Sequence, residues 1–246
     1  MRALAMLAMF APVVAQADPK LPTTTREVFA AGMSIEDSAI VEVQDFSLKN
    51  AGPYVRAVVG RFKSGEHVIG GAVLTWCDAK LCWLSHAWLG PGKVETLGLV
   101  DLGGAPAAFP NHAKMNHEHE LELDAKPAWP ALLVRATQRE QTTSSSRYGG
   151  TVSGEKRHVE LFVLSLSPSD TKSPTVLRET VDEHSPTGAG RSVTFAVGKT
   201  GHLVATEQRD LENISRCVQP KPTTAHYKLD EHRRFRRGMD LEHSGC

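Results

Sequence analysis

Residues 75–88 read TWCDAKLCWLSHAW and predict a β-hairpin that a disulfide closes. If Cys77 lies opposite Cys82, the four residues between them form a loop of a common hairpin length. Opposed residues of antiparallel strands have Cα atoms about 4.5–5.5 Å apart, within the range of about 4.4–6.8 Å that a disulfide accepts. The same register places Trp76 opposite Trp83, where the two rings can interact across the strands.

The residues of this stretch also allow other interpretations. Redox catalysis favours Cys-x-x-Cys before a helix, whereas here four residues separate two cysteines that lie in strands. A zinc clip needs two further ligands at matched spacing, and none is nearby. Three of the four tryptophans, Trp76, Trp83 and Trp88, form a candidate binding surface for a sugar or a protein partner. The spacing favours the structural disulfide.

Cys217 and Cys246 are the two remaining cysteines. Four cysteines allow three connectivities, and sequence alone does not choose among them. We favour Cys77–Cys82 together with Cys217–Cys246, a pair that would tie the C-terminal tail back to the fold. A free or intermolecular Cys246 is the alternative.

The hairpin belongs to a series of short segments with a period of two. Outward from it, the same pattern occurs at 40–46, 54–62, 67–76, 82–89, 94–99, 131–137, 158–167, 176–181, 192–197, 202–207 and 227–235. These segments are rich in Val, Leu, Phe and Thr, and Gly, Pro, Asn, Ser or charged turns separate them. Apart from a short helical turn near 26–31, no window has a sustained helical period. The sequence therefore predicts an all-β fold, an antiparallel sandwich or a barrel-like sheet.

Irregular segments divide the chain into expected units. The expected boundaries are a polar leader at 18–34, a first β unit at 35–103, an irregular linker at 104–130, a second β unit at 131–237 and a tail at 238–246. A polar, serine-rich loop is expected at 141–156. A faint internal echo between the halves raises the alternative that they are two similar, duplicated β units.

Residues 1–17, MRALAMLAMFAPVVAQA, have the organisation of a signal peptide. Arg2 precedes a short apolar run, and Ala15-Gln16-Ala17 supplies the small-x-small pattern of a cleavage site. The run is too short to cross about 30 Å of hydrocarbon, and no later segment predicts a membrane span. We expect a soluble protein, secreted or periplasmic, in an oxidising compartment that permits disulfides.

Histidines between the two expected units form the candidate metal site. On a strand, His117 and His119 project to the same face, and His112 precedes them by five residues, so the three could hold Zn²⁺ or Cu²⁺. The stretch is not HExxH, because position 123 is leucine. A polar linker with solvated charges, and no cofactor, is the interpretation that the isolated HxH pair favours.

No local motif points to catalysis. The chain lacks a Gly-x-Ser-x-Gly elbow, a P-loop and a dinucleotide fingerprint, so whether it is an enzyme stays open, with a non-enzymatic role favoured. Its 28 basic and 28 acidic residues cancel, which gives no indication of a nucleic-acid partner. Four arginines flank Phe235, either as a charged edge strand or as a patch for an anionic polymer. The sequence thus favours a non-catalytic binding or structural domain that contacts a protein or a glycan, with a metal-binding protein or metallohydrolase as the alternative.

Overall fold

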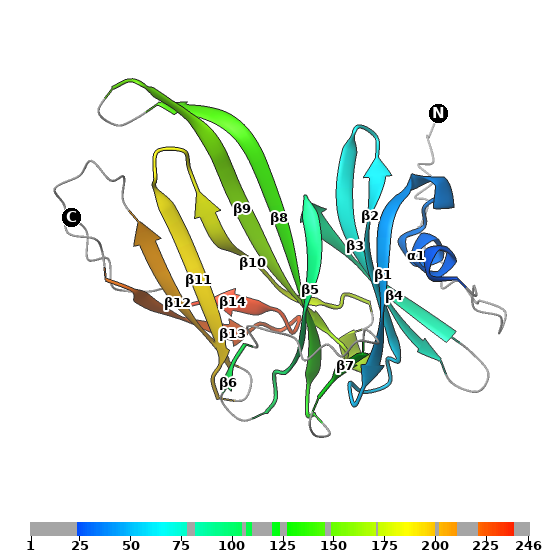
Figure 1. The fold of residues 1–246 in the computed structure, drawn as a ribbon. Helices are drawn as coiled ribbons and strands as arrows, with labels where there is room; N and C mark the ends of the chain where they lie inside the picture. The colour runs from blue at the N-terminus through cyan, green and yellow to red at the C-terminus, as the bar shows by residue number, and fades with distance from the viewer. Residues whose placement is uncertain are drawn as a thin grey trace, which may run out of the picture.

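The computed structural model describes residues 24–77, 82–104, 107–109, 120–123, 127–145, 149–170, 172–199, 202–210 and 221–238. Within these ranges the fold is all-β, as predicted, with one α-helix (Figure 1). The helix is α1 (Thr25–Met33), and short 3₁₀ turns lie at Asp37–Ala39 and Pro168–Asp170. The strands are β1 (Ile40–Lys49), β2 (Arg56–Ser64), β3 (His67–Cys77), β4 (Cys82–Pro91), β5 (Lys93–Asp101), β6 (Ala107–Ala108), β7 (Glu120–Glu122), β8 (Pro130–Ser145), β9 (Thr151–Ser165), β10 (Thr175–His184), β11 (Gly190–Val197), β12 (His202–Asp210), β13 (Thr223–Leu229) and β14 (Phe235–Arg237).

The strands form two sheets. The first has the order β4-β3-β2-β1-β7, and the second has the order β14-β13-β12-β11-β10-β9-β8-β5, with β6 paired to β11. Strand β7 runs parallel to β1, and all other pairs between described strands are antiparallel. Strand β5 follows β4 in the sequence but joins the second sheet, where it pairs with β8. Strand β7 lies between β6 and β8 in the sequence but joins the first sheet, where it pairs with β1. No helix in the ranges given above is long and apolar enough to cross a membrane.

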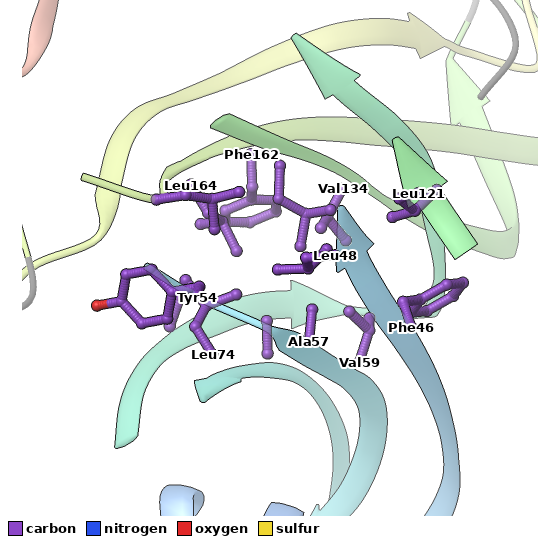
Figure 2. Packing of buried hydrophobic residues seen from close by; sticks show 14 of the residues in the cluster. Phe46, Leu48, Tyr54, Ala57, Val59, Leu74, Leu121, Val134, Phe162 and Leu164 are labelled. Carbon is purple, nitrogen blue, oxygen red and sulfur yellow. The ribbon is translucent and has the colours of Figure 1, made fainter. Parts of the chain in front are cut away.

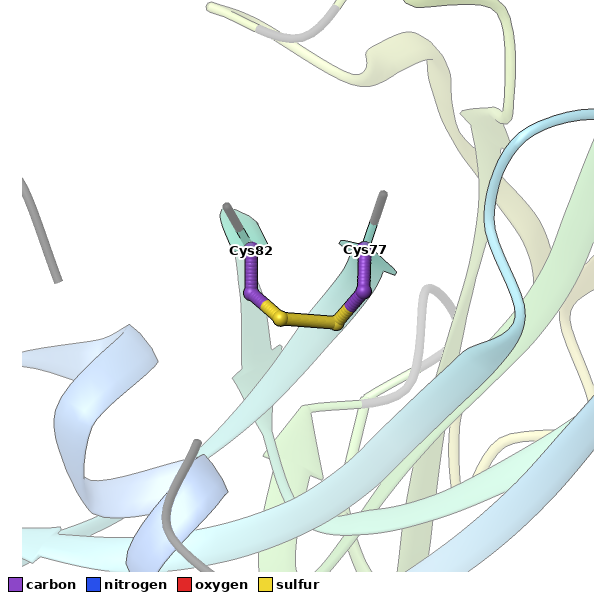
Figure 3. The surroundings of a disulfide bond; sticks show 2 residues. All are labelled: Cys77 and Cys82. Carbon is purple, nitrogen blue, oxygen red and sulfur yellow. A yellow bond between two sulfur atoms is a disulfide. The ribbon is translucent and has the colours of Figure 1, made fainter. Parts of the chain in front are cut away.

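The predicted hairpin forms between β3 and β4. Cys77 pairs with Cys82 and Trp76 with Trp83, in the predicted register. The two cysteines form the predicted disulfide, and Figure 3 shows it bridging the ends of the two strands. Their Cα atoms are 4.0 Å apart, slightly closer than the range expected from strand spacing. Because the disulfide and the register agree, local spacing was sufficient to predict this element.

Three apolar layers hold the sheets and the helix together. Leu74 and Val59 of the first sheet face Val134, Phe162 and other side chains of β8 and β9, as Figure 2 shows. The opposite face of the first sheet is covered by α1 (Figure 1). The second sheet curls, so that the outer face of β8 and β9 packs against strands β11 to β14 of the same sheet. Strands β8 and β9 therefore contribute to a core on each of their faces.

The prediction of a polar loop at 141–156 is wrong for most of this range, because β8 and β9 occupy it. Strands β8 and β9 extend into this range from both sides, with ladder pairs from Ala131–Ser165 out to Ser145–Thr151. This part of the two strands has few apolar residues. The backbone ladder nevertheless continues, and the hydroxyls of Thr143 and Ser153 form a hydrogen bond across it with an O–O distance of 2.9 Å. The prediction relied on an apolar period that a solvated hairpin does not need.

Two other local predictions change in the structure. The strand expected at 227–235 is divided into β13 and β14 by a turn at Asp230, whose carboxylate accepts hydrogen bonds from the backbone N–H groups of His232 and Arg234. The helical turn expected near 26–31 is the longer helix α1. A capping box starts it, because Thr24 and Glu27 satisfy each other's backbone N–H groups.

Candidate functional site

The structure separates the three tryptophans of the candidate binding surface. Trp76 and Trp83 stack with their ring centroids 4.3 Å apart, and both are half-buried on the face that points to the second sheet. Trp88 lies five residues after Trp83 on the same strand, so it points to the opposite face. There it packs edge-on against Phe62 and remains 49% exposed. Among the described residues it is the one exposed aromatic side chain.

Trp88 lines a groove of about 450 Å³ between β4 and the start of β10. We call it the Trp88 groove, and we define it by Trp88, Phe162, Lys172, Arg178, Arg234 and Arg236. Residues from three distant parts of the sequence thus meet at one place. The whole lining contains four lysine or arginine side chains and no carboxylate, which sets this groove apart from the neutral chain as a whole.

The turn between β13 and β14 positions two of these arginines. Asp230 Oδ1 accepts hydrogen bonds from the backbone N–H groups of His232 at 2.9 Å and Arg234 at 2.8 Å. Its Oδ2 accepts one from Arg236 Nε at 3.0 Å. The backbone N–H of Arg234 contributes most to holding the pKa of Asp230 below its ordinary value, so this carboxylate stays charged and keeps the turn closed.

A buried series of hydrogen bonds and an ion pair also supports the turn between β13 and β14. Trp129 Nε1 donates to Ser165 Oγ at 2.8 Å, and Ser165 Oγ donates to Asp170 Oδ2 at 2.5 Å. Asp170 is buried and forms an ion pair with Arg233 Nε at 2.8 Å. The guanidinium of Arg233 also lies 4.7 Å from the centre of the Trp129 ring. These contacts fix the backbone on which Arg234 is presented.

The basic side chains of the groove differ in how far they are neutralised. Arg178 is held in a fork by Glu160, with N–O distances of 2.9 and 3.0 Å, and its guanidinium lies 5.3 Å from the Phe162 ring centre. Lys172 and Arg234 are exposed, and neither makes an ion pair within the described part of the chain. Arg234 Nη2 donates instead to the neutral hydroxyl of Ser173 at 3.0 Å. The groove therefore offers positive charge that no carboxylate of the described residues balances.

Several predicted site residues fall outside the described residues. They are His112, His117 and His119 of the candidate metal site, and Cys217 and Cys246 of the second candidate disulfide. Among the residues that the structure does describe, no group of three or more His, Cys, Asp or Glu side chains is arranged to hold a metal ion.

Sequence reasoning did not find the Trp88 groove as a site. It treated Trp88 as part of the hairpin surface and considered the arginines around Phe235 separately. The alternation of residues along β4 was the available signal, because it places Trp88 on the other face from Trp83. Nothing local indicates that β4 and the β13–β14 turn meet.

Comparison with known proteins gives no relative to guide the assignment: no family model, no curated protein and no solved structure matches this chain.

Proposed function

We propose that this protein is an exported, non-catalytic binding domain that contacts an acidic glycan through the Trp88 groove. The observation that carries the proposal is the exposed indole of Trp88 in one groove with Lys172 and Arg234, two basic groups without a carboxylate partner among the described residues. The N-terminal signal-like segment and the disulfide are in keeping with an extracytoplasmic role.

The chemistry of the groove suits a chain of sugar rings that carry acidic groups. An exposed indole offers a flat apolar face against which the C–H groups of a sugar ring can pack. Arginine and lysine bind carboxylate and sulfate by charge-assisted hydrogen bonds, and arginine adds the geometry of its planar fork. Lys172, Arg234 and Arg236 supply these donors beside Trp88. Both parts of an acidic polysaccharide are thus matched.

We expect the protein to bind polygalacturonate or dextran sulfate and not neutral dextran, as measured by affinity electrophoresis and isothermal titration calorimetry. Trp88→Ala and Lys172→Met should each weaken binding about five- to tenfold, corresponding to about 1 kcal/mol for a lost ring contact or charge. Binding should also weaken with added salt, because the groups involved are exposed. The two polymers distinguish carboxylate from sulfate as the preferred acidic group.

The matched control is Lys63→Met, which removes another exposed lysine, on β2, that lies outside the Trp88 groove. It should bind these polymers as the wild type does, and Trp88→Phe should retain much of the affinity because it keeps a ring. If neutral dextran bound as tightly as the acidic polymers, or if Lys63→Met and Lys172→Met lost the same affinity, the proposal would be wrong. Thermal melts of all variants confirm that they are folded.

A further inference from the structure

A second and larger groove lies on the concave face of the curled second sheet. Its volume is about 910 Å³, and β5, β8, β9, β10 and β11 contribute to it. We call it the curled-sheet groove and define it by Lys93, Arg135, Arg139, Arg157, Val159 and Val193. It shares no lining residue with the Trp88 groove, so the two are separate sites on the molecule. Its volume is within the range of about 300–1,000 Å³ typical of small-molecule sites.

The curled-sheet groove lies at the end of a buried apolar layer, where polar side chains replace apolar ones on the same faces of the strands. Along β8, Leu133 belongs to the core of the curled sheet, and Arg135, two residues later on the same face, lines the groove. Along β9 the same change occurs from Leu161 through Val159 to Arg157. Because alternate residues share a face, each strand has an apolar section in the core and a basic section in the groove.

The arginines of this groove are only partly engaged by their carboxylate partners. Arg135 Nη2 lies 2.7 Å from Glu95 Oε2. Arg157 Nη2 lies 2.7 Å from Asp182 Oδ2 and 3.3 Å from His184 Nδ1. The Nε atoms of both arginines are buried without a hydrogen-bond partner. Arg178 differs, because Glu160 occupies both Nε and Nη2 of that side chain. A buried N–H without an acceptor is costly, and an oxyanion that draws the guanidinium outwards, so that Nε reaches the groove, would relieve that cost.

Lys93 adds a charge that no carboxylate of the described residues neutralises. The turn before it brings β5 against β8, because Gly92 has a φ of 102° and any Cβ there would collide with the carbonyl oxygen of Thr137. The lining has four basic side chains, Lys93 and three arginines. Each arginine has one carboxylate partner, Arg139 through Glu155 at 3.3 Å, so the excess positive charge among the described residues is that of Lys93. An anion entering the groove would therefore meet a net positive charge.

Valines form the apolar part of the groove. Val159 and Val193 are buried at 5% and 7% exposure, and Val181 lies beside them in the lining. We propose that the curled-sheet groove binds a small organic oxyanion, a carboxylate or a phosphate, that carries a short apolar chain. The oxyanion contacts Lys93 and the arginine forks, and the chain lies on the valines.

Isothermal titration calorimetry of the full chain with octanoate, octyl phosphate, acetate and 1-octanol tests this proposal. Octanoate or octyl phosphate should bind, and comparison of the two identifies the preferred oxyanion. Acetate and 1-octanol should each bind at least about tenfold more weakly, because one lacks the apolar chain and the other lacks the charge. Lys93→Met should weaken the preferred ligand about fivefold, whereas Lys63→Met, at an exposed lysine that lines neither groove, should leave it unchanged.

A second variant tests the fork itself. Arg135→Lys keeps the charge beside Glu95 but removes the planar pair of donors, and it should weaken binding about fivefold with an unchanged melting temperature. No binding of octanoate or octyl phosphate at millimolar concentration would overturn the proposal, as would equal affinity for 1-octanol or an equal loss in Lys93→Met and Lys63→Met. Failure of this site leaves the glycan proposal untouched, because polysaccharide binding depends on Lys172 and not on Lys93.

Discussion

Glu207 is buried at 2% exposure and carries a charge that three arginines share. Its carboxylate accepts hydrogen bonds from Arg209 Nε at 2.6 Å, Arg237 Nη1 at 2.9 Å and Arg191 Nη2 at 3.1 Å. Burial by itself raises the pKa of Glu207, but the hydrogen bonds from the three arginines outweigh it and lower the pKa to about 2. One residue therefore joins β11, β12 and β14.

We expect Glu207→Gln to lower the free energy of unfolding by about 3 kcal/mol at pH 7, since the pKa of the wild-type carboxyl falls from 4.5 to about 2 on folding. Because the folded pKa is the lower one, this contribution is complete above about pH 4.5 and disappears as the pH falls towards 2. Urea denaturation at pH 7 and pH 3 measures it. The difference between the wild type and the variant should therefore be smaller at pH 3.

The control for this prediction is Glu66→Gln, which removes an exposed carboxylate from the turn between β2 and β3. Its free energy of unfolding should stay within about 0.5 kcal/mol of the wild type. If Glu207→Gln were as stable as this control at pH 7, the charge of Glu207 would not contribute to the free energy of unfolding through the three arginines, and the prediction would be wrong.

At the scale of the element, α1 shows how packing can override local propensity. Gly32 lies in the last turn of the helix, where glycine costs about 1 kcal/mol relative to alanine. In this fold, however, a Cβ at position 32 would collide with Val73 Cγ1 and lie 2.6 Å from Cγ2. The glycine therefore allows the helix to lie close to the first sheet, on the layer that contains Phe29 and Val58.

We expect Gly32→Ala to destabilise the protein by about 1–3 kcal/mol, because the overlap with Val73 outweighs the gain in helix propensity. Chemical denaturation with far-UV circular dichroism measures the change. In a Val73→Ala background the same substitution should cost much less, and this double-mutant cycle isolates the contact. Stabilisation by Gly32→Ala in the wild-type background would mean that propensity dominates and the helix is not closely packed there.

At the scale of the whole molecule, the stability of each sheet depends on the other, because β8 and β9 contribute side chains to a core on each of their faces. Leu132 and Leu133 are adjacent and fully buried, yet Leu132 packs between the sheets and Leu133 packs inside the curled sheet. Phe162 and Val163 of β9 divide in the same way. Loss of either core removes support from a strand that the other core needs.

We expect Leu132→Ala and Leu133→Ala each to lower the free energy of unfolding by about 2–5 kcal/mol, as for other buried leucines. Both variants should still unfold in one transition, with tryptophan fluorescence and far-UV circular dichroism coinciding. Val152→Ala, at an exposed position on β9, should change stability by less than about 1 kcal/mol. Two separate transitions, each shifted by only one of the leucine variants, would show that the halves unfold independently.

The sequence by itself determined the all-β class, the register of the β3–β4 hairpin and its disulfide. These features depend on side chains two residues apart or on a loop of four residues, and such short-range geometry can be read from spacing. The capping box of Thr24 and Glu27 is equally local, but the residue pattern predicted only a short helical turn near 26–31 and did not place the helix start.

Only the tertiary structure decided which surfaces meet. Trp88 and Arg234 are 146 positions apart in the chain, and Lys93 and Arg157 are 64 apart, yet each pair lines one groove. A period of two tells which face a residue occupies, but it does not tell which strand covers that face. The curl of the second sheet and the extension of β8 and β9 into a long polar ladder determine which surfaces meet. Both features depend on contacts across the whole fold, which local spacing does not specify.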